Sequence, residues 1–437
     1  MRRLLWLAGL TIAAAAAGLG AFEELFDGAP DHPAIGYQKL SKDPVAELNR
    51  KLLEGAAQLT YDETSGYLPS VLRALHVPVE SQIVAFSKTS VQQNRIGPKN
   101  PRTLFFNDAV VVGWVRGGFI ELAAQDPQQG VVFYTLDQSQ AAAAALAMKP
   151  LLKPQFERKD GCLGCHLSFN TLGVPGMLLR SVFPAADGAA EYQAGSYVTD
   201  HRSPMEQRWG GWYVTGNSGS VRHLGNAIVS DLEKPESMVN ESTLHAESLK
   251  GKIDTSLYLS PYSDIAALMV FDHQMRMMNL LTRVNWETRY GLYREKMKLV
   301  ADPAEQGDFA ARLRDAVSEM VDYLFFLDEA PLNGPIHGTS GFAEKFSSQG
   351  PRDKQRRSLR QLDLERRLLR YPCSYMIYSD AFENLPPEAK DAVYKRMWEV
   401  LSGVERGPKY ARLTVADRQN VVEILRDTKK DLPGYFH

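Results

Sequence analysis

The segment Cys162-Leu163-Gly164-Cys165-His166 constrains the fold of this chain more than any other part of its 437 residues. It places two thiols two residues apart and an imidazole directly after the second thiol. Groups that bind metals or form covalent bonds therefore share one short stretch of backbone, and the surrounding fold must accommodate what they hold. Covalent haem attachment, zinc sites and dithiol redox pairs all use this kind of spacing.

The alternatives to haem attachment lack supporting residues. A zinc site needs further ligands at comparable spacing, and Cys373, the third cysteine, has no cysteine or histidine near it. A thioredoxin-like pair would follow a strand and begin a helix, whereas Pro154 and the charged stretch 157–160 predict a loop. A disulfide between Cys162 and Cys165 would close a small, strained ring. The spacing therefore favours haem, with each thiol bonded to a vinyl group and the histidine reaching the iron.

In these five residues the sequence resembles the c-type cytochromes, and the resemblance is confined to them. It implies one covalently bound haem c on Cys162 and Cys165, with His166 as an axial iron ligand. It also implies that haem is attached after export of the unfolded chain. A small cytochrome c domain is helical on both sides of the motif and much shorter than this chain, so the resemblance implies the cofactor rather than the carrier fold.

The N-terminal segment predicts export. Met1-Arg2-Arg3 precede an uncharged stretch from 4 to 22 that is rich in alanine and glycine. A basic start, an apolar stretch and small residues are typical of a secretory signal, predicted here over residues 1–22. The stretch is nearly long enough to span a bilayer, so an N-terminal anchor tethering the protein to the inner membrane is the alternative. Either way, the remainder of the chain is expected in the periplasm or otherwise exported.

Composition limits the classes of partner. The formal net charge is -2 and the sequence pI is about 6.5, which argues against nucleic acid and against an anionic membrane surface. A redox partner protein or a small carrier is the expected partner. With two cysteines assigned to haem, no disulfide is expected, and the apolar neighbours of Cys373 predict a buried core residue.

The pattern of apolar residues changes near residue 260, from a period of two to a period of 3.6. We predict an α+β fold: a haem c-binding region over 23–260, with short antiparallel strands around the haem loop, and a mainly α-helical region over 261–437 that packs on it. Strands are expected at 104–106, 109–115, 119–123, 131–136, 177–183, 192–199 and 209–215. Helices are expected at 139–148, 263–290, 303–326, 355–369, 387–402 and 414–428, with Ser263, Asp302 and Thr414 as N-caps. The basic helix within 352–370 is either a docking face for an acidic redox partner or an ordinary solvated amphipathic helix.

The residue on the second face of the iron decides between electron transfer and catalysis. A strong protein ligand closes the iron, whereas an open face admits small substrates such as peroxide. His273 is one candidate, because it shares a predicted helix face with Met269 and Met277. The alternative is a buried helix face with one satisfied histidine.

The other distal candidates lie in less regular segments. His201 occurs in a polar, turn-rich stretch, and His223 in a glycine-rich one where backbone could approach a ligand. Met177 follows a Gly-Val-Pro-Gly segment that could fold back over the haem, or else begins a core strand. For each of these residues, the alternative is a purely structural role without contact to the iron.

Two functions follow from these observations. The first is an exported monohaem c-type cytochrome that takes part in electron transfer. The alternative is a haem c oxidoreductase, peroxidase-like in the broad sense, with substrate at an open distal iron face. Chain length favours the alternative, because a simple carrier does not need a chain this long. The sequence identifies no catalytic residue.

Overall fold

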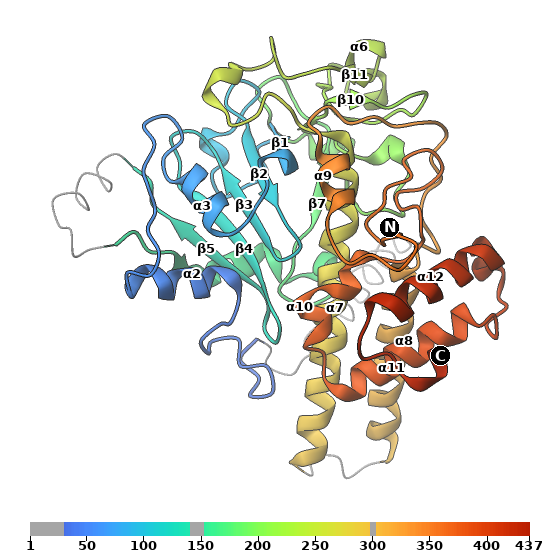
Figure 1. Ribbon diagram of the computed structural model, residues 1–437. Coiled ribbons are helices and arrows are strands. Elements are labelled where there is room, and N and C mark those ends of the chain that lie inside the picture. Colours follow the sequence, from blue (N-terminus) through green and yellow to red (C-terminus); the bar gives the residue numbers. More distant parts are fainter. Residues whose placement is uncertain (1–29, 140–152, 298–302) are drawn as a thin grey trace, which may run out of the picture.

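The computed structural model describes residues 30–139, 153–297 and 303–437 (Figure 1). The fold is α+β, as predicted, with 39% helix, 15% strand, antiparallel sheets and a helical C-terminal region. The predicted signal or anchor at 1–22, most of the predicted helix at 139–148 and the predicted N-cap Asp302 lie outside the described residues. Across the described ranges, no helix is both long enough and apolar enough to cross a membrane.

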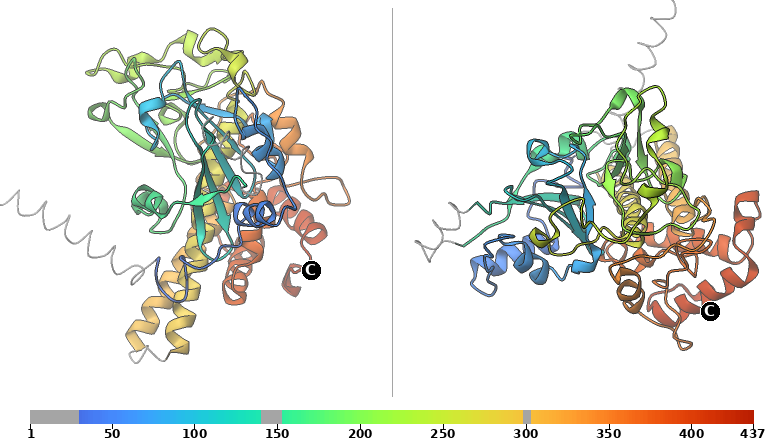
Figure 2. Two further views of the ribbon diagram at one scale, coloured as in Figure 1. Left: turned by 90° about the vertical axis from the view of Figure 1, so that its left-hand side faces the viewer. Right: turned by 90° about the horizontal axis from the view of Figure 1, so that it is seen from above.

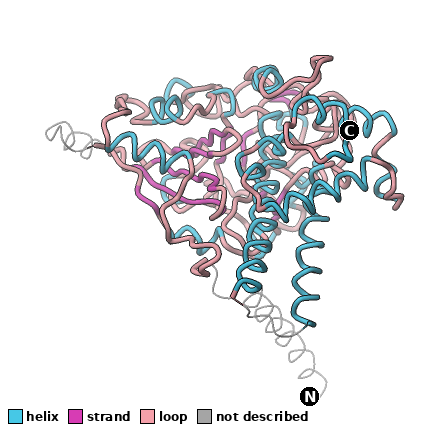
Figure 3. The backbone as a smooth tube through the Cα atoms, turned by 60° about the horizontal axis from the view of Figure 1, so that its bottom comes forward, coloured by secondary structure: helices cyan, strands magenta, loops and turns pink. Residues whose placement is uncertain are grey.

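A seven-stranded antiparallel sheet forms one side of the molecule (Figures 1 and 3). Its order is β6-β5-β4-β3-β2-β1-β9. The strands are β1 Ile83–Ala85, β2 Arg102–Phe106, β3 Val110–Trp114, β4 Ile120–Asp126, β5 Gly130–Leu136, β6 Glu157–Arg158 and β9 Trp212–Tyr213. The predicted meander is therefore confirmed, because turn residues separate runs rich in β-branched and aromatic side chains.

Two small antiparallel pairs follow the motif. They are β7 Leu179–Val182 with β8 Ser196–Thr199, and β10 Gly216–Asn217 with β11 His245–Ala246. The strands expected at 177–183, 192–199 and 209–215 are thus present but shorter than predicted. The backbone packs closely at Gly210, where a Cβ would lie 2.1 Å from the carbonyl oxygen of Val182, and β9 spans only Trp212–Tyr213.

Helices flank both faces of the large sheet and build the C-terminal region (Figures 1 and 2). They are α2 Pro44–Leu53, α3 Leu68–Ala74, α5 Leu163–His166, α6 Glu241–Leu244, α7 Ile265–Lys296, α8 Pro303–Leu324, α9 Phe342–Ser348, α10 Asp380–Glu383, α11 Pro387–Leu401 and α12 Val415–Thr428. Four of the predicted helices correspond to α7, α8, α11 and α12. Thr414 and Asp417 form the predicted capping box of α12.

The N-cap of α7 is Asp264 and not Ser263, which corrects the prediction by one residue. The Asp264 carboxylate accepts hydrogen bonds from the N–H groups of Ala266 and Ala267. Ser263 instead donates its hydroxyl to the carbonyl oxygen of Tyr213, so that it ties the start of α7 to the large sheet.

The stretch predicted as a basic helix at 355–369 is irregular. Asp353 and Asp363 accept hydrogen bonds from backbone N–H groups two to four residues ahead, and these turns compete with a helix. Arg356 and Leu364 have φ values of 65° and 58°, which no α-helix contains. The leucine spacing marked buried positions rather than a helix, and the helical docking face proposed for this stretch does not exist.

The two faces of the large sheet belong to different core clusters. One face packs with α2 and α3. The other face packs against α7. Side chains from the C-terminal region pack on α7 in turn. This larger cluster runs without interruption across residue 260, from Ile83 to Phe436. Cys373 lies inside it, fully buried, as predicted. None of the three cysteines is in a disulfide.

The candidate haem-attachment site

The stretch 157–160, predicted as a loop, contains the two-residue strand β6, so the expected absence of a strand before the motif was wrong, and the motif at 162–166 forms a short helical turn. A 3-10 turn at Asp160–Cys162 continues directly into α5, and β6 lies just before it. Cys165 is exposed and Cys162 is half-buried, and both thiols are free. Gly161 and Gly164 have no atom within 4 Å of the point where a Cβ would stand. The outer face of the motif is therefore open.

His166 is held in one orientation by the loop that follows it. Its Nδ1 lies 2.9 Å from the carbonyl oxygen of Gly176, and the Gly176 N–H donates back to the carbonyl oxygen of His166 at 2.9 Å. Because a carbonyl oxygen only accepts, Nδ1 carries the proton and Nε2 keeps a free lone pair. Burial lowers the pKa of His166, so the ring is neutral at pH 7. The ring of Phe133, on β5, packs 4.7 Å from the imidazole.

The long helix α7 fixes this loop in turn. Asn279, on α7, accepts from the Met177 N–H at 3.0 Å and donates to the Met177 carbonyl oxygen at 2.7 Å. A Cβ at Gly176 would lie 2.2 Å from Asn279 Oδ1, so only glycine permits this approach. The carbonyl that orients His166 is thus positioned by a side chain from the opposite half of the chain.

An ion pair that sequence reasoning missed lies beside the motif. Arg102 on β2 and Glu121 on β4 are 2.8 Å apart and both are largely buried. Burial raises the pKa of the Cys162 thiol, and the negative charge of Glu121 raises it further. The same carboxylate and Arg102 act in opposite directions on the pKa of His166. In the sequence, Glu121 stands out as a charged residue within the otherwise largely apolar strand β4. The sequence does not show which side chains lie next to it.

The structure brings two of the predicted distal residues together. His201 Nδ1 and His273 Nδ1 are 2.8 Å apart, and His273 Nε2 lies 2.7 Å from the hydroxyl of Ser374. Burial lowers the pKa of His273 to about 3 and that of His201 well below its usual range. Both rings are therefore neutral, and the two form a hydrogen-bonded pair inside the core. Over the part of the chain that the structure describes, no hydrogen bond or ring contact joins either of them to His166.

The remaining distal candidates are also buried. His223 accepts from the Gly225 N–H at 3.1 Å through Nδ1, and burial lowers its pKa to about 4. Met177 directly follows Gly176, which binds His166 Nδ1, so its backbone lies on the side of the ring away from Nε2. Its side chain packs in the larger core cluster.

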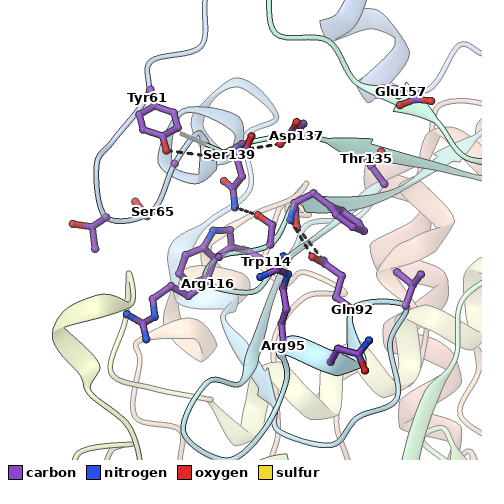
Figure 4. Close-up of a pocket in the computed structure, with 18 of the residues that line it drawn as sticks. Tyr61, Ser65, Gln92, Arg95, Trp114, Arg116, Thr135, Asp137, Ser139 and Glu157 are labelled. Carbon is purple, nitrogen blue, oxygen red and sulfur yellow. Dashed lines mark hydrogen bonds between the residues drawn. The ribbon is translucent and has the colours of Figure 1, made fainter. Parts of the chain in front are cut away.

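A cavity of about 1320 Å³ adjoins the motif segment at the end of the large sheet. We call it the end cavity. Five chain segments line it, together with Leu257: 61–66, 91–95, 114–119, 135–139 and 155–159. Lys159 in its wall lies just before the motif, and Gln92 in its wall donates to Glu121 at 3.1 Å. Figure 4 shows Glu157 and Thr135 on one side of the cavity and Arg116 and Arg95 on another.

Comparison with known proteins adds no assignment. No family model, no curated protein and no solved structure matches this chain.

Proposed function

We propose that the protein is an exported monohaem c-type cytochrome that binds one haem c through Cys162 and Cys165 and takes part in electron transfer. The observation that carries the proposal is the orientation of His166. Its proton is held on Nδ1 by the Gly176 carbonyl, which leaves Nε2 as an iron ligand next to two free thiols. A merely structural histidine would not need a pair of unbonded thiols beside it.

The residues present fit the haem group. Both thiols stand on one helical turn with the imidazole, and Gly161 and Gly164 leave the outer face of the motif open. When bound, haem would supply a centre that accepts and releases one electron. The chain's own residues hold the neutral imidazole in place and set the charge around it through Glu121 and Arg102.

The surroundings of the motif support electron exchange at the surface. Cys165 is exposed, and the side chain of Phe169, three residues after the motif, is 84% exposed. A haem edge at this position would be reachable by a redox partner protein or a small carrier. The predicted signal or anchor at 1–22 supports attachment outside the cytoplasm, and the inner-membrane tether remains its alternative.

Haemochrome spectra of cysteine variants test the proposal. The protein is purified from cells competent in cytochrome maturation, denatured in alkaline pyridine and reduced. We expect the wild type to show a haem c spectrum that survives extraction with acid acetone, and the double variant Cys162→Ser/Cys165→Ser to lose it. Cys373→Ala, which removes a buried thiol outside the motif, is the matched control and should keep the spectrum. Colour that the acid solvent extracts from the wild type would refute the proposal.

Carbon monoxide separates electron transfer from the oxidoreductase alternative. A carrier with a closed iron should give the same reduced spectrum with and without the gas. Prompt binding would reveal an open iron face and would favour a substrate at that face over electron transfer alone.

A further inference from the structure

We propose that a pocket beside Arg360 binds a small aromatic carboxylate. The pocket has a volume of about 230 Å³ and lies between the segment after α3, the turn that joins β2 and β3, helix α9 and the middle of α7. We call it the Arg360 pocket. Sites for drug-sized ligands occupy roughly 300–1,000 Å³, so this pocket suits a smaller molecule. The proposal rests on the pocket's own side chains and does not depend on haem attachment.

Arg360 is deeply buried but uses few of its hydrogen-bond donors. The residue is only 6% exposed, and within the described residues its side chain bonds only to Asp108, through Nη2. Nε and Nη1 have no partner there, yet neither is sealed from solvent. Because a guanidinium donates through all three of its nitrogens, a ligand in the pocket can reach N–H groups that the protein leaves free.

Arg357, in the same irregular segment, shows how an arginine that serves only the fold is bonded. Its Nε donates to Asp353 at 2.6 Å, its Nη1 to Asn420 at 2.7 Å and its Nη2 to Glu423 at 2.7 Å. Its side chain is nevertheless the more exposed of the two, at 13% against 8% for Arg360. The more deeply buried guanidinium is thus the less satisfied one, and an incoming carboxylate would satisfy it.

The guanidinium is held in place before any ligand arrives. Its central carbon lies 4.6 Å from the ring centroid of Phe346 and 4.5 Å from that of Tyr375. The Tyr375 hydroxyl donates to Gln274 on α7 at 2.8 Å. At Gly350, with φ of 77°, a Cβ would lie 3.2 Å from Nε of Arg360, so glycine keeps the space beside this nitrogen open. A group oriented in this way loses little freedom on binding.

The charges of the lining favour a single carboxylate. Arg360 and Lys345 both line the pocket, but Lys345 is already paired with Glu80 at 2.8 Å. Asp108, the partner of Arg360, has a side chain that is 41% exposed, so water screens much of its charge, whereas the guanidinium is buried. The positive charge of Arg360 is therefore only partly balanced on the side that faces the pocket.

The apolar part of the lining indicates the body of the ligand. Phe106 and Phe342 lie with their ring centroids 5.7 Å apart, and Phe342 and Phe346 with theirs 5.5 Å apart. All three residues line the pocket. A wall of aromatic rings favours a flat apolar body, so the carboxylate is expected on an aromatic ring.

Calorimetric titration of the purified full-length protein tests the proposal with benzoate and with two probes that each lack one feature. Benzamide has the ring but no charge, and acetate has the charge but no ring. We expect saturable binding of benzoate. Each of the other two probes should bind about tenfold more weakly or worse, because the charged hydrogen bonds and the ring contacts both contribute.

Two substitutions should change benzoate binding in opposite directions. Arg360→Gln removes the guanidinium and should weaken binding about tenfold or more. Asp108→Asn removes a negative charge next to the bound carboxylate, while its amide oxygen can still accept from Arg360, and should strengthen binding about threefold or more. An arginine that served only the fold would give no such increase.

Arg356→Gln is the matched control. Arg356 is an exposed arginine in the same segment, lies outside the pocket lining, and makes no side-chain hydrogen bond or ion pair within the described ranges. Its substitution should leave benzoate binding unchanged.

The proposal is overturned if benzoate shows no saturable binding, or if benzamide or acetate binds as tightly. It is also overturned if Arg360→Gln folds and binds like the wild type, or if Asp108→Asn does not strengthen binding. Circular dichroism of each variant checks that the fold is retained. Should Arg360→Gln unfold, the three probes on the wild type and the Asp108→Asn variant still decide the outcome.

Discussion

Among single residues, Glu121 acts electrostatically on both a thiol and the histidine of the motif. Its carboxylate acts on both Cys162 and His166 and is only one-fifth exposed, so water screens it weakly. A negative charge beside a haem stabilises the oxidised iron. We therefore expect Glu121→Gln to raise the reduction potential of the bound haem, by an amount on the order of tens of millivolts.

Redox titration monitored by the haem absorbance measures this shift. Glu388→Gln removes an equivalent carboxylate from an exposed position in α11 and should leave the potential where it is in the wild type. A potential that stays constant or falls in Glu121→Gln would mean that the carboxylate does not face the haem.

The sequence was sufficient to find the chemical groups of the motif but not their partners. Cys162, Cys165 and His166 are recognisable because their function depends on spacing within one turn. Gly176 and Glu121 act through contacts that bring separate chain segments together, and no local pattern marks such contacts. The same limit applies to His201 and His273, which were predicted separately as distal ligands and are hydrogen-bonded to each other.

At the scale of elements, α7 depends on its N-terminal carboxylate. Asp264 is fully buried and accepts hydrogen bonds from the first turn of α7 and from the N–H groups of Thr339 and Ser340. Asp264→Ala would leave these donors without a partner, so we expect the free energy of unfolding to fall by roughly 3 kcal/mol or more.

Thr414→Ala is the comparison, because it removes the cap of α12, where Thr414 and the first two helix residues are exposed to solvent. Its expected cost is about 1 kcal/mol. Urea unfolding followed by circular dichroism compares the two variants. Equal losses would show that the links from Asp264 to the 339–340 segment contribute nothing.

Helices and strands could be predicted where the spacing of apolar residues agrees with the turn residues between them. The meander of β2 to β5 has apolar runs separated by Asn-Asp, Gly-Gly and Asp-Pro turns, and both signals were correct. In 355–369 the leucines recur at helical spacing, but Asp353 and Asp363 direct the backbone into turns. Leu359, Leu364 and Leu368 are buried, but the helix predicted from their spacing was wrong.

For the whole molecule, buried histidines make stability depend on pH. His223 has a folded-state pKa of about 4, below the usual 6.5, because burial penalises the charged ring. The unfolded chain therefore binds this proton first as the pH falls. The stability that neutral His223 contributes is present above pH 6.5 and is lost as the pH falls towards 4.

We expect the difference in unfolding free energy between pH 7 and pH 5 to shrink by roughly 2 kcal/mol in His223→Gln relative to wild type. Glu329 acts in the opposite sense, because burial raises its folded-state pKa to about 7 and its contribution falls as the pH rises. The comparison is therefore made between variant and wild type by urea unfolding at both pH values. An unchanged difference would mean that His223 has the same pKa in the folded and the unfolded chain.

The organisation of the whole molecule was predicted only in part. The change of period near residue 260 lies close to the start of α7 at Ile265. It gave no sign that one core cluster would run through both regions, from β1 to the C-terminal turn. That continuity arises because α7 packs its two sides against different partners. The spacing of apolar residues in the sequence does not show which elements those partners are.

The intact mass of the purified protein under denaturing acid shows whether haem is covalently bound to the chain. We expect a chain heavier by one haem, with the added mass on a peptide that contains both Cys162 and Cys165. A chain of unmodified mass, from cells shown to mature another c-type cytochrome, would contradict it.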